Sequence, residues 1–142
     1  MGEKRIGYTT GVFDMFHIGH LNILRNAKEN CDYLIVGVTT DEEVQRVKNR
    51  LPIISYNERS AIVEAIQYVD EVVPEKDTDK IKAWEDLKFN VLYKGSDWKG
   101  SQKCDNYETF FNPKQVEIVY FPYTDGTSST KLRAMMEKIL NS

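Results

Sequence analysis

Short apolar runs alternate along this chain with segments in which apolar residues recur every three or four positions. The clearest run is Asp32–Val38, where aliphatic and β-branched residues follow one another almost without interruption. Such runs are typical of strands that are buried on both faces of a parallel sheet. Four weaker segments complete a predicted set of five strands: Arg5–Thr10, Glu71–Val73, Val91–Tyr93 and Val116–Phe121.

Apolar residues at helical spacing lie between these runs. They occur within His20–Glu29, after Ser55, within Asp79–Lys88 and from about Ser129 onward. Ser55 and Glu58 form the S-x-x-E pattern of a capping box, which predicts a helix start. The residues that we expect to share one face of that helix are Ile62, Ala65, Ile66 and Val69.

Strands that alternate with helices indicate βαβ units, and therefore a parallel sheet with right-handed crossovers. We expect one α/β domain over residues 1–142, with a Rossmann-like, doubly wound and mainly parallel five-stranded sheet. In such sheets, ligands bind beyond the carboxyl ends of the strands, where the strand order reverses. The loops that follow the strands are therefore where functional residues are expected.

Composition and charge narrow the class of protein. The chain is 41% hydrophobic and 29% charged, with a net charge of −3, so no basic field points to nucleic acid or an anionic membrane. Neither cysteine has metal-ligand spacing, which favours a reduced, cytoplasmic protein over one with a disulfide. We see no signal peptide and no stretch long enough to span a bilayer.

The loop after the first strand contains both histidines of the chain, His17 and His20. Gly11 and Gly19 let the backbone approach a ligand closely, and a helix that begins near Gly19 offers its N-terminus to phosphate. Histidines three residues apart project from one side and can donate hydrogen bonds to a phosphate that gains charge. A metal site lacks a third ligand with suitable spacing, and helix capping or core burial remains an alternative.

The segment Gly11-Val-Phe-Asp-Met-Phe-His-Ile-Gly-His20 resembles the G-T-F-D-x-x-H-x-G-H signature of the cytidylyltransferase family. The likeness is greatest to its bacterial glycerol-3-phosphate branch. Three later segments, 68–72, 95–100 and 124–130, resemble the family motifs R-Y-V-D-E-V, G-D-D-W-x-G and R-T-E-G-I-S-T-T in the same order. The resemblance therefore covers nearly the whole chain.

The resemblance implies transfer of CMP from CTP to a phosphorylated small alcohol, with release of pyrophosphate. It implies Mg²⁺ held mainly by phosphate oxygens, no protein metal ligands, and a homodimer as the assembly. His17, His20 and Lys48 are the expected catalytic residues, and Lys48 also contacts the substrate. The expected nucleotide-binding residues are Gly11, Val12, Phe13, Gly19, Arg50, Asp97, Trp98, Thr124, Asp125, Gly126, Thr127, Ser128, Ser129 and Thr130.

The same residues have purely structural interpretations. Lys48 and Arg50 belong to a basic run of the kind that complements a helix dipole at its end. Asp97 and Trp98 suit a turn that packs on the core, and the hydroxyls around Ser129 suit a helix N-cap. Sequence alone leaves both interpretations open.

The chain departs from the family at Gln67 and Tyr123, where arginines are usual, and at Ser96, where aspartate is usual. Substitutes for the missing cations are sought among Arg59, Lys80, Lys94 and Lys99, and Lys80 is taken as a substrate contact. The departures leave the acceptor and the base open. The alternatives are an adenylyltransferase, a different phosphate or phosphonate acceptor, a non-catalytic nucleotide-binding module, and a metal-dependent hydrolase.

Overall fold

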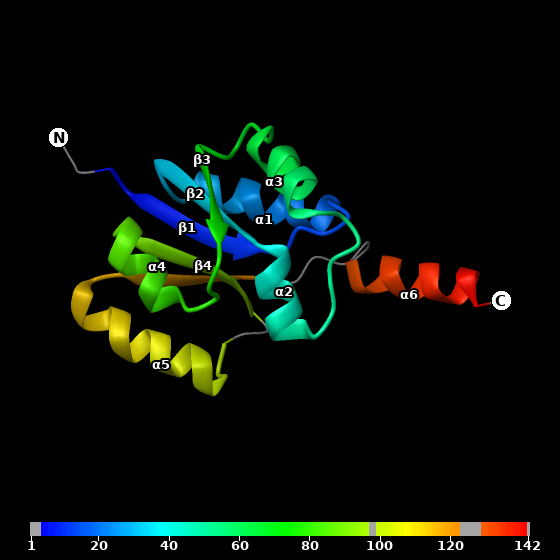
Figure 1. The fold of residues 1–142 in the computed structure, drawn as a ribbon. Coiled ribbons are helices and arrows are strands. Elements are labelled where there is room, and N and C mark those ends of the chain that lie inside the picture. The colour runs from blue at the N-terminus through cyan, green and yellow to red at the C-terminus, as the bar shows by residue number, and fades with distance from the viewer. Residues whose placement is uncertain (1–3, 97–98, 123–128, 142) are drawn as a thin grey trace.

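A five-stranded parallel sheet forms the centre of the structure (Figure 1), a computed structural model that describes residues 4–96, 99–122 and 129–141. The strand order is β3-β2-β1-β4-β5, and every neighbouring pair is parallel. The strands are β1 (Ile6–Gly11), β2 (Tyr33–Thr39), β3 (Glu71–Glu75), β4 (Val91–Gly95) and β5 (Glu117–Phe121). The chain runs outward from β1 to β3 and then crosses to β4, which confirms the predicted doubly wound sheet with a switch point beside β1.

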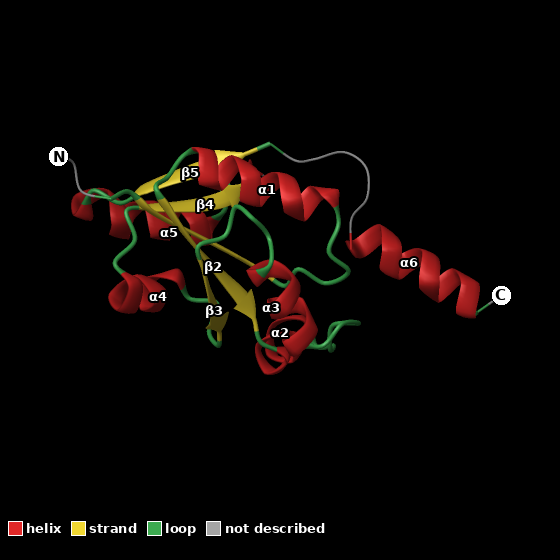
Figure 2. Ribbon diagram, turned by 90° about the horizontal axis from the view of Figure 1, so that it is seen from above, coloured by secondary structure: helices red, strands yellow, loops and turns green. Residues whose placement is uncertain are grey.

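Helices cover both faces of the sheet (Figures 1 and 2). α1 (Ile18–Glu29) and α3 (Tyr56–Glu64) pack on one face, and α4 (Lys80–Leu87) and α5 (Gln102–Phe111) pack on the other. α2 (Asp41–Lys48) follows β2, a short 3₁₀ helix spans Asn112–Lys114, and α6 (Ser129–Leu140) projects from the body. Within the described ranges, no helix has the length and apolar character needed to cross a membrane.

Strand β2 explains why the sequence contains one near-continuous apolar run. Leu34, Val36 and Val38 face the core beneath α1 and α3, whereas Ile35 belongs to the core beneath α4 and α5. All four side chains are at most 4% exposed. A strand that is buried on both faces does not alternate apolar with polar residues, so aliphatic side chains follow one another along most of β2.

The helix predicted after Ser55 is present, but two of its details are wrong. Ser55 is the N-cap residue, yet its side chain makes no capping hydrogen bond and instead lies 3.5 Å from the Glu58 carboxylate. The helix ends at Glu64, before most of the predicted stripe. Within it, Val63 is fully buried and Ile62 is 45% exposed, because the face toward the sheet is set by Arg59 and Val63, four residues apart.

The sequence pattern also left α5 unpredicted. Its buried residues, Cys104, Tyr107 and Phe111, recur at helical spacing, but polar residues and a phenylalanine pair obscure the period. The same residues carry the second core: Tyr107 and Phe111 pack in the cluster that contains Leu92. Phe111 is fully buried in this core.

We predict that Val63→Ala lowers the free energy of unfolding by about 1–3 kcal/mol, because it leaves a cavity beneath α3. Ile62→Ala, the matched control on the neighbouring exposed position, is expected to change it by less than about 0.5 kcal/mol. Urea denaturation of the two variants measures both values. Equal losses would contradict the observed orientation of α3.

Candidate active site

A cavity of about 490 Å³ opens at the carboxyl ends of the strands, where the sequence placed the ligand. Its wall brings together residues from the loops after β1 to β4 and from the starts of α1 and α6. The predicted site residues that line it are Gly11, Val12, Phe13, His17, Gly19, His20, Lys48, Arg50, Lys80, Ser129 and Thr130. The remaining predicted residues, Asp97, Trp98, Thr124, Asp125, Gly126, Thr127 and Ser128, lie outside the described ranges.

The two histidines form a reciprocal cap at the start of α1. Nδ1 of His17 accepts a hydrogen bond from the backbone N–H of Gly19 at 3.1 Å, and Nδ1 of His20 accepts one from the backbone N–H of His17 at 3.2 Å. The rings are stacked, with centroids 3.9 Å apart. Because both Nδ1 atoms are acceptors, each neutral imidazole carries its proton on Nε2. Capping and ligand binding are therefore compatible roles that use different nitrogens of the same ring.

Both imidazoles are uncharged at neutral pH. Burial lowers the pKa of His17. Burial and then the neighbouring His17 lower the pKa of His20 to about 4, against a smaller opposing effect of Asp14. A neutral Nε2–H still donates a hydrogen bond, but it adds no positive charge to the cavity.

The buried carboxylate of Asp14 joins three segments that surround the cavity. Its oxygens accept hydrogen bonds from the backbone N–H groups of Ile53 and Ile54, at 2.8 and 2.9 Å. Arg133 of α6 forms a 2.7 Å ion pair with the same carboxylate, and the Ser129 hydroxyl donates to the Asp14 backbone carbonyl. The motif quoted from the sequence contained Asp14, but gave no sign of these partners.

Arg59, which the sequence offered as a possible phosphate contact, has a structural role instead. Its side chain is 1% exposed. It donates hydrogen bonds to the backbone carbonyls of Val12, Thr39 and Ile54 at 2.6–2.8 Å, and it pairs with Asp41 at 2.6 Å. These contacts tie the loops after β1 and β2 to the start of α3, so Arg59 shapes the cavity from behind its wall.

Three cations reach the cavity near the histidines. Lys48 ends α2, Arg50 follows it, and Arg133 comes from α6. Partial burial and then the charges of Arg50 and Arg133 lower the pKa of Lys48, while Asp14 raises it. Cations grouped in this way form a favourable environment for a polyanion.

One departure from the family, Gln67, and one candidate substitute cation, Lys99, can be located, whereas Tyr123 lies outside the described residues. Gln67, in place of the family arginine, is exposed and is not among the residues that line the cavity. Lys99 is also exposed and lies over the ring of Tyr120, 5.7 Å from its centroid. Neither residue brings a cation to the cavity. Arg133 does supply a guanidinium group there, which the sequence did not indicate. Its one signal was its position, a single helical turn after Ser129.

A buried ion pair also lines the cavity. The Lys80 amine contacts the Glu75 carboxylate at 2.6 Å and the Thr78 carbonyl at 3.0 Å. Thr39 donates to the second Glu75 oxygen at 2.7 Å. Lys80 and Glu75 are 3% and 4% exposed, so the charge of Lys80 is balanced within the protein. Lys80 therefore lines the cavity, but its positive charge is paired with the Glu75 carboxylate.

The acidic side chains offer no ready-made metal cage. Among the described residues, no group of three or more His, Cys, Asp and Glu side chains is arranged to hold a metal ion. Asp14 and Glu75, the acidic residues that line the cavity, already accept hydrogen bonds from protein donors. A cation in this cavity would therefore depend on ligand oxygens for most of its coordination.

Comparisons with known proteins agree with this geometry. Residues 8–135 match the family described as cytidylyltransferase-like. The glycerol-3-phosphate cytidylyltransferase of Bacillus subtilis (strain 168) is 42% identical over 127 residues, which cover 88% of this chain and 92% of that protein. The enzyme of the same name from Staphylococcus aureus is 37% identical over 131 residues, which cover 92% of each chain.

A solved structure supports the fold alone. The lipopolysaccharide core biosynthesis protein from Thermoplasma volcanium superposes with a TM-score of 0.71 at 24% identity, covering 88% of this chain and all of that one. The family match extends from β1 into α6 and includes every described segment that lines the cavity. The chain therefore belongs to the cytidylyltransferase-like family.

Proposed function

We propose that the protein transfers CMP from CTP to a phosphorylated small alcohol of the glycerol-3-phosphate kind and releases pyrophosphate. The observation that carries this proposal is the paired Nε2 donors of His17 and His20, which share a cavity with Lys48, Arg50 and Arg133. The names and high coverage of the bacterial relatives support the choice of nucleotide and acceptor.

In the proposed reaction, an oxygen of the acceptor phosphate attacks the α-phosphorus of CTP. A new P–O bond forms in line with the bond that breaks, and pyrophosphate leaves with that electron pair. The attacking oxygen is already anionic, so no strong general base is required. Catalysis then depends on positioning and on stabilising the charge that develops.

His17 and His20 donate Nε2–H hydrogen bonds to the α-phosphate oxygens, whose charge grows in the transition state. Protonated imidazoles would also neutralise part of this charge. Since their pKa values are lowered, Lys48 and Arg50 provide the positive charge instead. Ser129 and the N-terminus of α6 face the β- and γ-phosphates in this assignment.

Magnesium fits this cavity as a companion of the nucleotide. Asp14 and Glu75 are occupied by protein donors, so the triphosphate oxygens would supply most ligands. When bound, Mg²⁺ neutralises part of the triphosphate charge. The residues described above orient the phosphates.

The direct test is pyrophosphate release in the presence of Mg²⁺, with CTP or ATP as donor and glycerol-3-phosphate as acceptor. We expect release that requires both CTP and an acceptor phosphate. Faster release with ATP would favour an adenylyltransferase, and CTP binding without release would favour a non-catalytic binding module. Pyrophosphate formed without any acceptor would favour a hydrolase.

Two variants separate the proposed chemistry from capping. His17→Asn and His20→Asn each keep a side-chain acceptor for the capping hydrogen bond, because the amide oxygen of asparagine can take the place of Nδ1. Each lacks a donor that reaches as far as Nε2. Each is expected to lower kcat by about 10²–10³-fold while thermal denaturation stays close to that of the wild type. Lys82→Met, at an exposed lysine outside the cavity, is the control. Near-normal turnover in both histidine variants would refute these roles.

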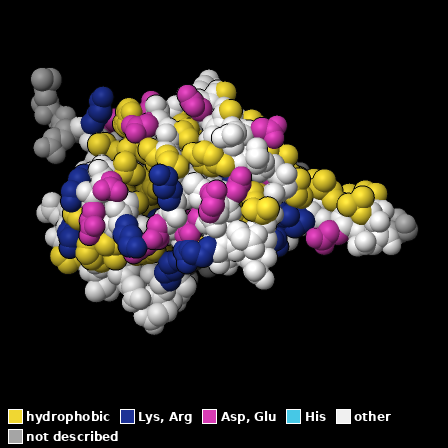
Figure 3. All heavy atoms as spheres, in the orientation of Figure 1, with side chains coloured by type: hydrophobic (Ala, Val, Ile, Leu, Met, Phe, Trp, Pro, Cys, Tyr) yellow, Lys and Arg dark blue, Asp and Glu magenta, His cyan; other side chains and the backbone are white. Residues whose placement is uncertain are grey.

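We also infer a cytoplasmic location and a homodimer. Free thiols at Cys31 and Cys104 support a reducing compartment. The projecting α6 supports an interface, since Met135, Ile139 and Leu140 are 60–82% exposed and hydrophobic side chains run along this helix in Figure 3.

Sedimentation velocity tests the assembly. We expect twice the 16.5 kDa chain mass for the wild type. An Ile139→Asp, Leu140→Asp double variant should sediment as a monomer, because two charges would be buried at the interface. A monomeric wild type, or a double variant that remains dimeric, would reject α6 as the interface.

A further inference from the structure

The reaction proposed above gives no specific role to Arg133, although this side chain lines the cavity. Arg133 lies four residues after Ser129, the first residue of α6. Residues four apart share one face of a helix, so the Ser129 hydroxyl and the Arg133 guanidinium project from the same side of α6. Thr130 also lines the cavity. This part of α6 therefore brings hydroxyl groups and a guanidinium together beside the N-terminus of the helix.

The Asp14 carboxylate holds the Arg133 guanidinium in place. Nη2 of Arg133 donates to Oδ2 of Asp14 at 2.7 Å, and the same carboxylate accepts from the backbone N–H groups of two residues, Ile53 and Ile54. The Arg133 side chain is 18% exposed, and that of Asp14 is 3% exposed. Because the pair is largely buried, the guanidinium is oriented before a ligand arrives, and binding then costs little side-chain entropy.

The pair with Asp14 uses only part of the hydrogen-bonding capacity of Arg133. A guanidinium has five N–H donors, and among the described residues Asp14 accepts from Nη2 alone. Nε and Nη1 therefore keep donors that can serve a ligand in the cavity. Burial, then Arg50 and then Arg133 lower the pKa of Lys48, so the charges of Arg133 and Lys48 act on the same part of the cavity.

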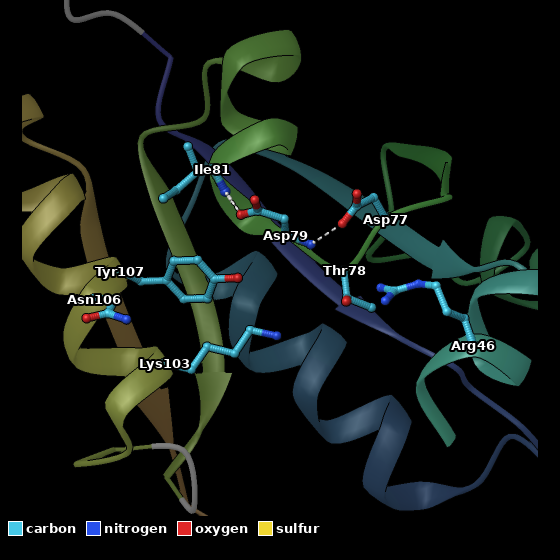
Figure 4. A pocket seen from close by; sticks show the side chains of 8 residues that line it. All are labelled: Arg46, Asp77, Thr78, Asp79, Ile81, Lys103, Asn106 and Tyr107. Atoms are coloured by element: carbon cyan, nitrogen blue, oxygen red, sulfur yellow. Dashed lines mark hydrogen bonds between the residues drawn. The ribbon is translucent and has the colours of Figure 1, made fainter. Parts of the chain in front are cut away.

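A second arginine lines a smaller hollow and shows the opposite arrangement. Arg46 extends from α2 along the wall of this hollow, which measures about 370 Å³ (Figure 4). Its Nε and Nη2 both donate to the Glu43 carboxylate at 2.6 Å, and Asp77 and Asp79 line the same hollow. Carboxylates at these positions disfavour a polyanion. Of the two arginines, Arg133 is therefore the one that is placed to bind phosphate.

We propose that Arg133 is a further catalytic residue, which binds the β- and γ-phosphates of the nucleotide and stabilises pyrophosphate as it leaves. Asp14 holds the guanidinium through Nη2, while Nε and Nη1 donate to phosphate oxygens beside Ser129. This role deepens the proposed function and rests on it, because it assumes that a nucleoside triphosphate occupies the cavity.

The chemistry of the leaving group favours a guanidinium at this position. When the bond between the α-phosphorus and the bridging oxygen breaks, pyrophosphate keeps the electron pair and gains negative charge. A guanidinium can make two parallel charge-assisted hydrogen bonds to phosphate oxygens, which a single ammonium group cannot reproduce. A contact that strengthens as this charge develops stabilises the transition state more than the bound substrate. Arg133 is therefore expected to affect both the binding of CTP and kcat.

The test compares CTP with CMP, which lacks the β- and γ-phosphates. Titration calorimetry with Mg²⁺ present measures the Kd of each nucleotide. We expect Arg133→Gln to weaken CTP binding by about 10–100-fold, the effect of losing charge-assisted hydrogen bonds, and to leave CMP binding within about twofold. Lys138→Gln, at an exposed position of the same helix outside the cavity, is the control and should change neither Kd.

Arg133→Lys separates phosphate binding from the attachment of α6. A lysine keeps a positive charge that can pair with Asp14, but it lacks the planar fork of donors. We expect this variant to recover part of the CTP affinity and to keep the thermal denaturation midpoint of the wild type. Its kcat for pyrophosphate release should still fall by about tenfold. The comparison of CTP with CMP in this variant carries the test even where Arg133→Gln does not fold.

The outcomes separate this inference from the proposed function. Equal losses of CTP and CMP affinity in Arg133→Lys, or no loss of either, would overturn the phosphate contact while cytidylyl transfer stands. A loss confined to CTP, in a protein that releases no pyrophosphate with any acceptor, would support the phosphate contact and reject the reaction. A wild type that binds neither CTP nor pyrophosphate would overturn both.

Discussion

The site depends on one buried carboxylate, that of Asp14. It binds two backbone N–H groups of the segment before α3 and the guanidinium of Arg133, and its backbone carbonyl accepts from Ser129. The residues on either side, Phe13 and Met15, have φ angles of 54° and 50°, a region that side chains disfavour. A buried charge with satisfied partners can hold such a loop, whereas loss of those partners would leave an unpaired charge costing several kcal/mol.

The position of this carboxylate helps to explain why the imidazoles and the cations of the cavity have different roles. The loop that Asp14 fixes presents His17 and His20 as reciprocal caps, so their Nδ1 atoms are occupied and their Nε2 atoms carry the protons. Burial keeps the rings uncharged, and the positive charge comes from Lys48 and its neighbours. Neutral imidazole donors with fixed directions, together with separate positively charged side chains, suit a reaction that depends on positioning rather than on proton transfer.

Sequence reasoning succeeded where the signal is local. The apolar run of β2 predicted a strand buried on both faces, and the spacing of His17 and His20 predicted their meeting at a helix start. It failed where tertiary packing decides. No local sequence pattern shows that Val63 is buried and Ile62 exposed. None shows that the Arg59 guanidinium donates to backbone carbonyls. Arg133 reaches Asp14 from 119 residues away, and such pairs are invisible without the fold.

The central claim is that the cavity presents two uncharged imidazoles that are protonated at Nε2. Long-range ¹H–¹⁵N correlation NMR tests it directly, because the chain contains only two histidines. We expect Nε2–H tautomers for both rings at pH 7, with His20 remaining neutral until the pH approaches about 4. Nδ1–H tautomers, or rings already protonated at pH 7, would contradict it.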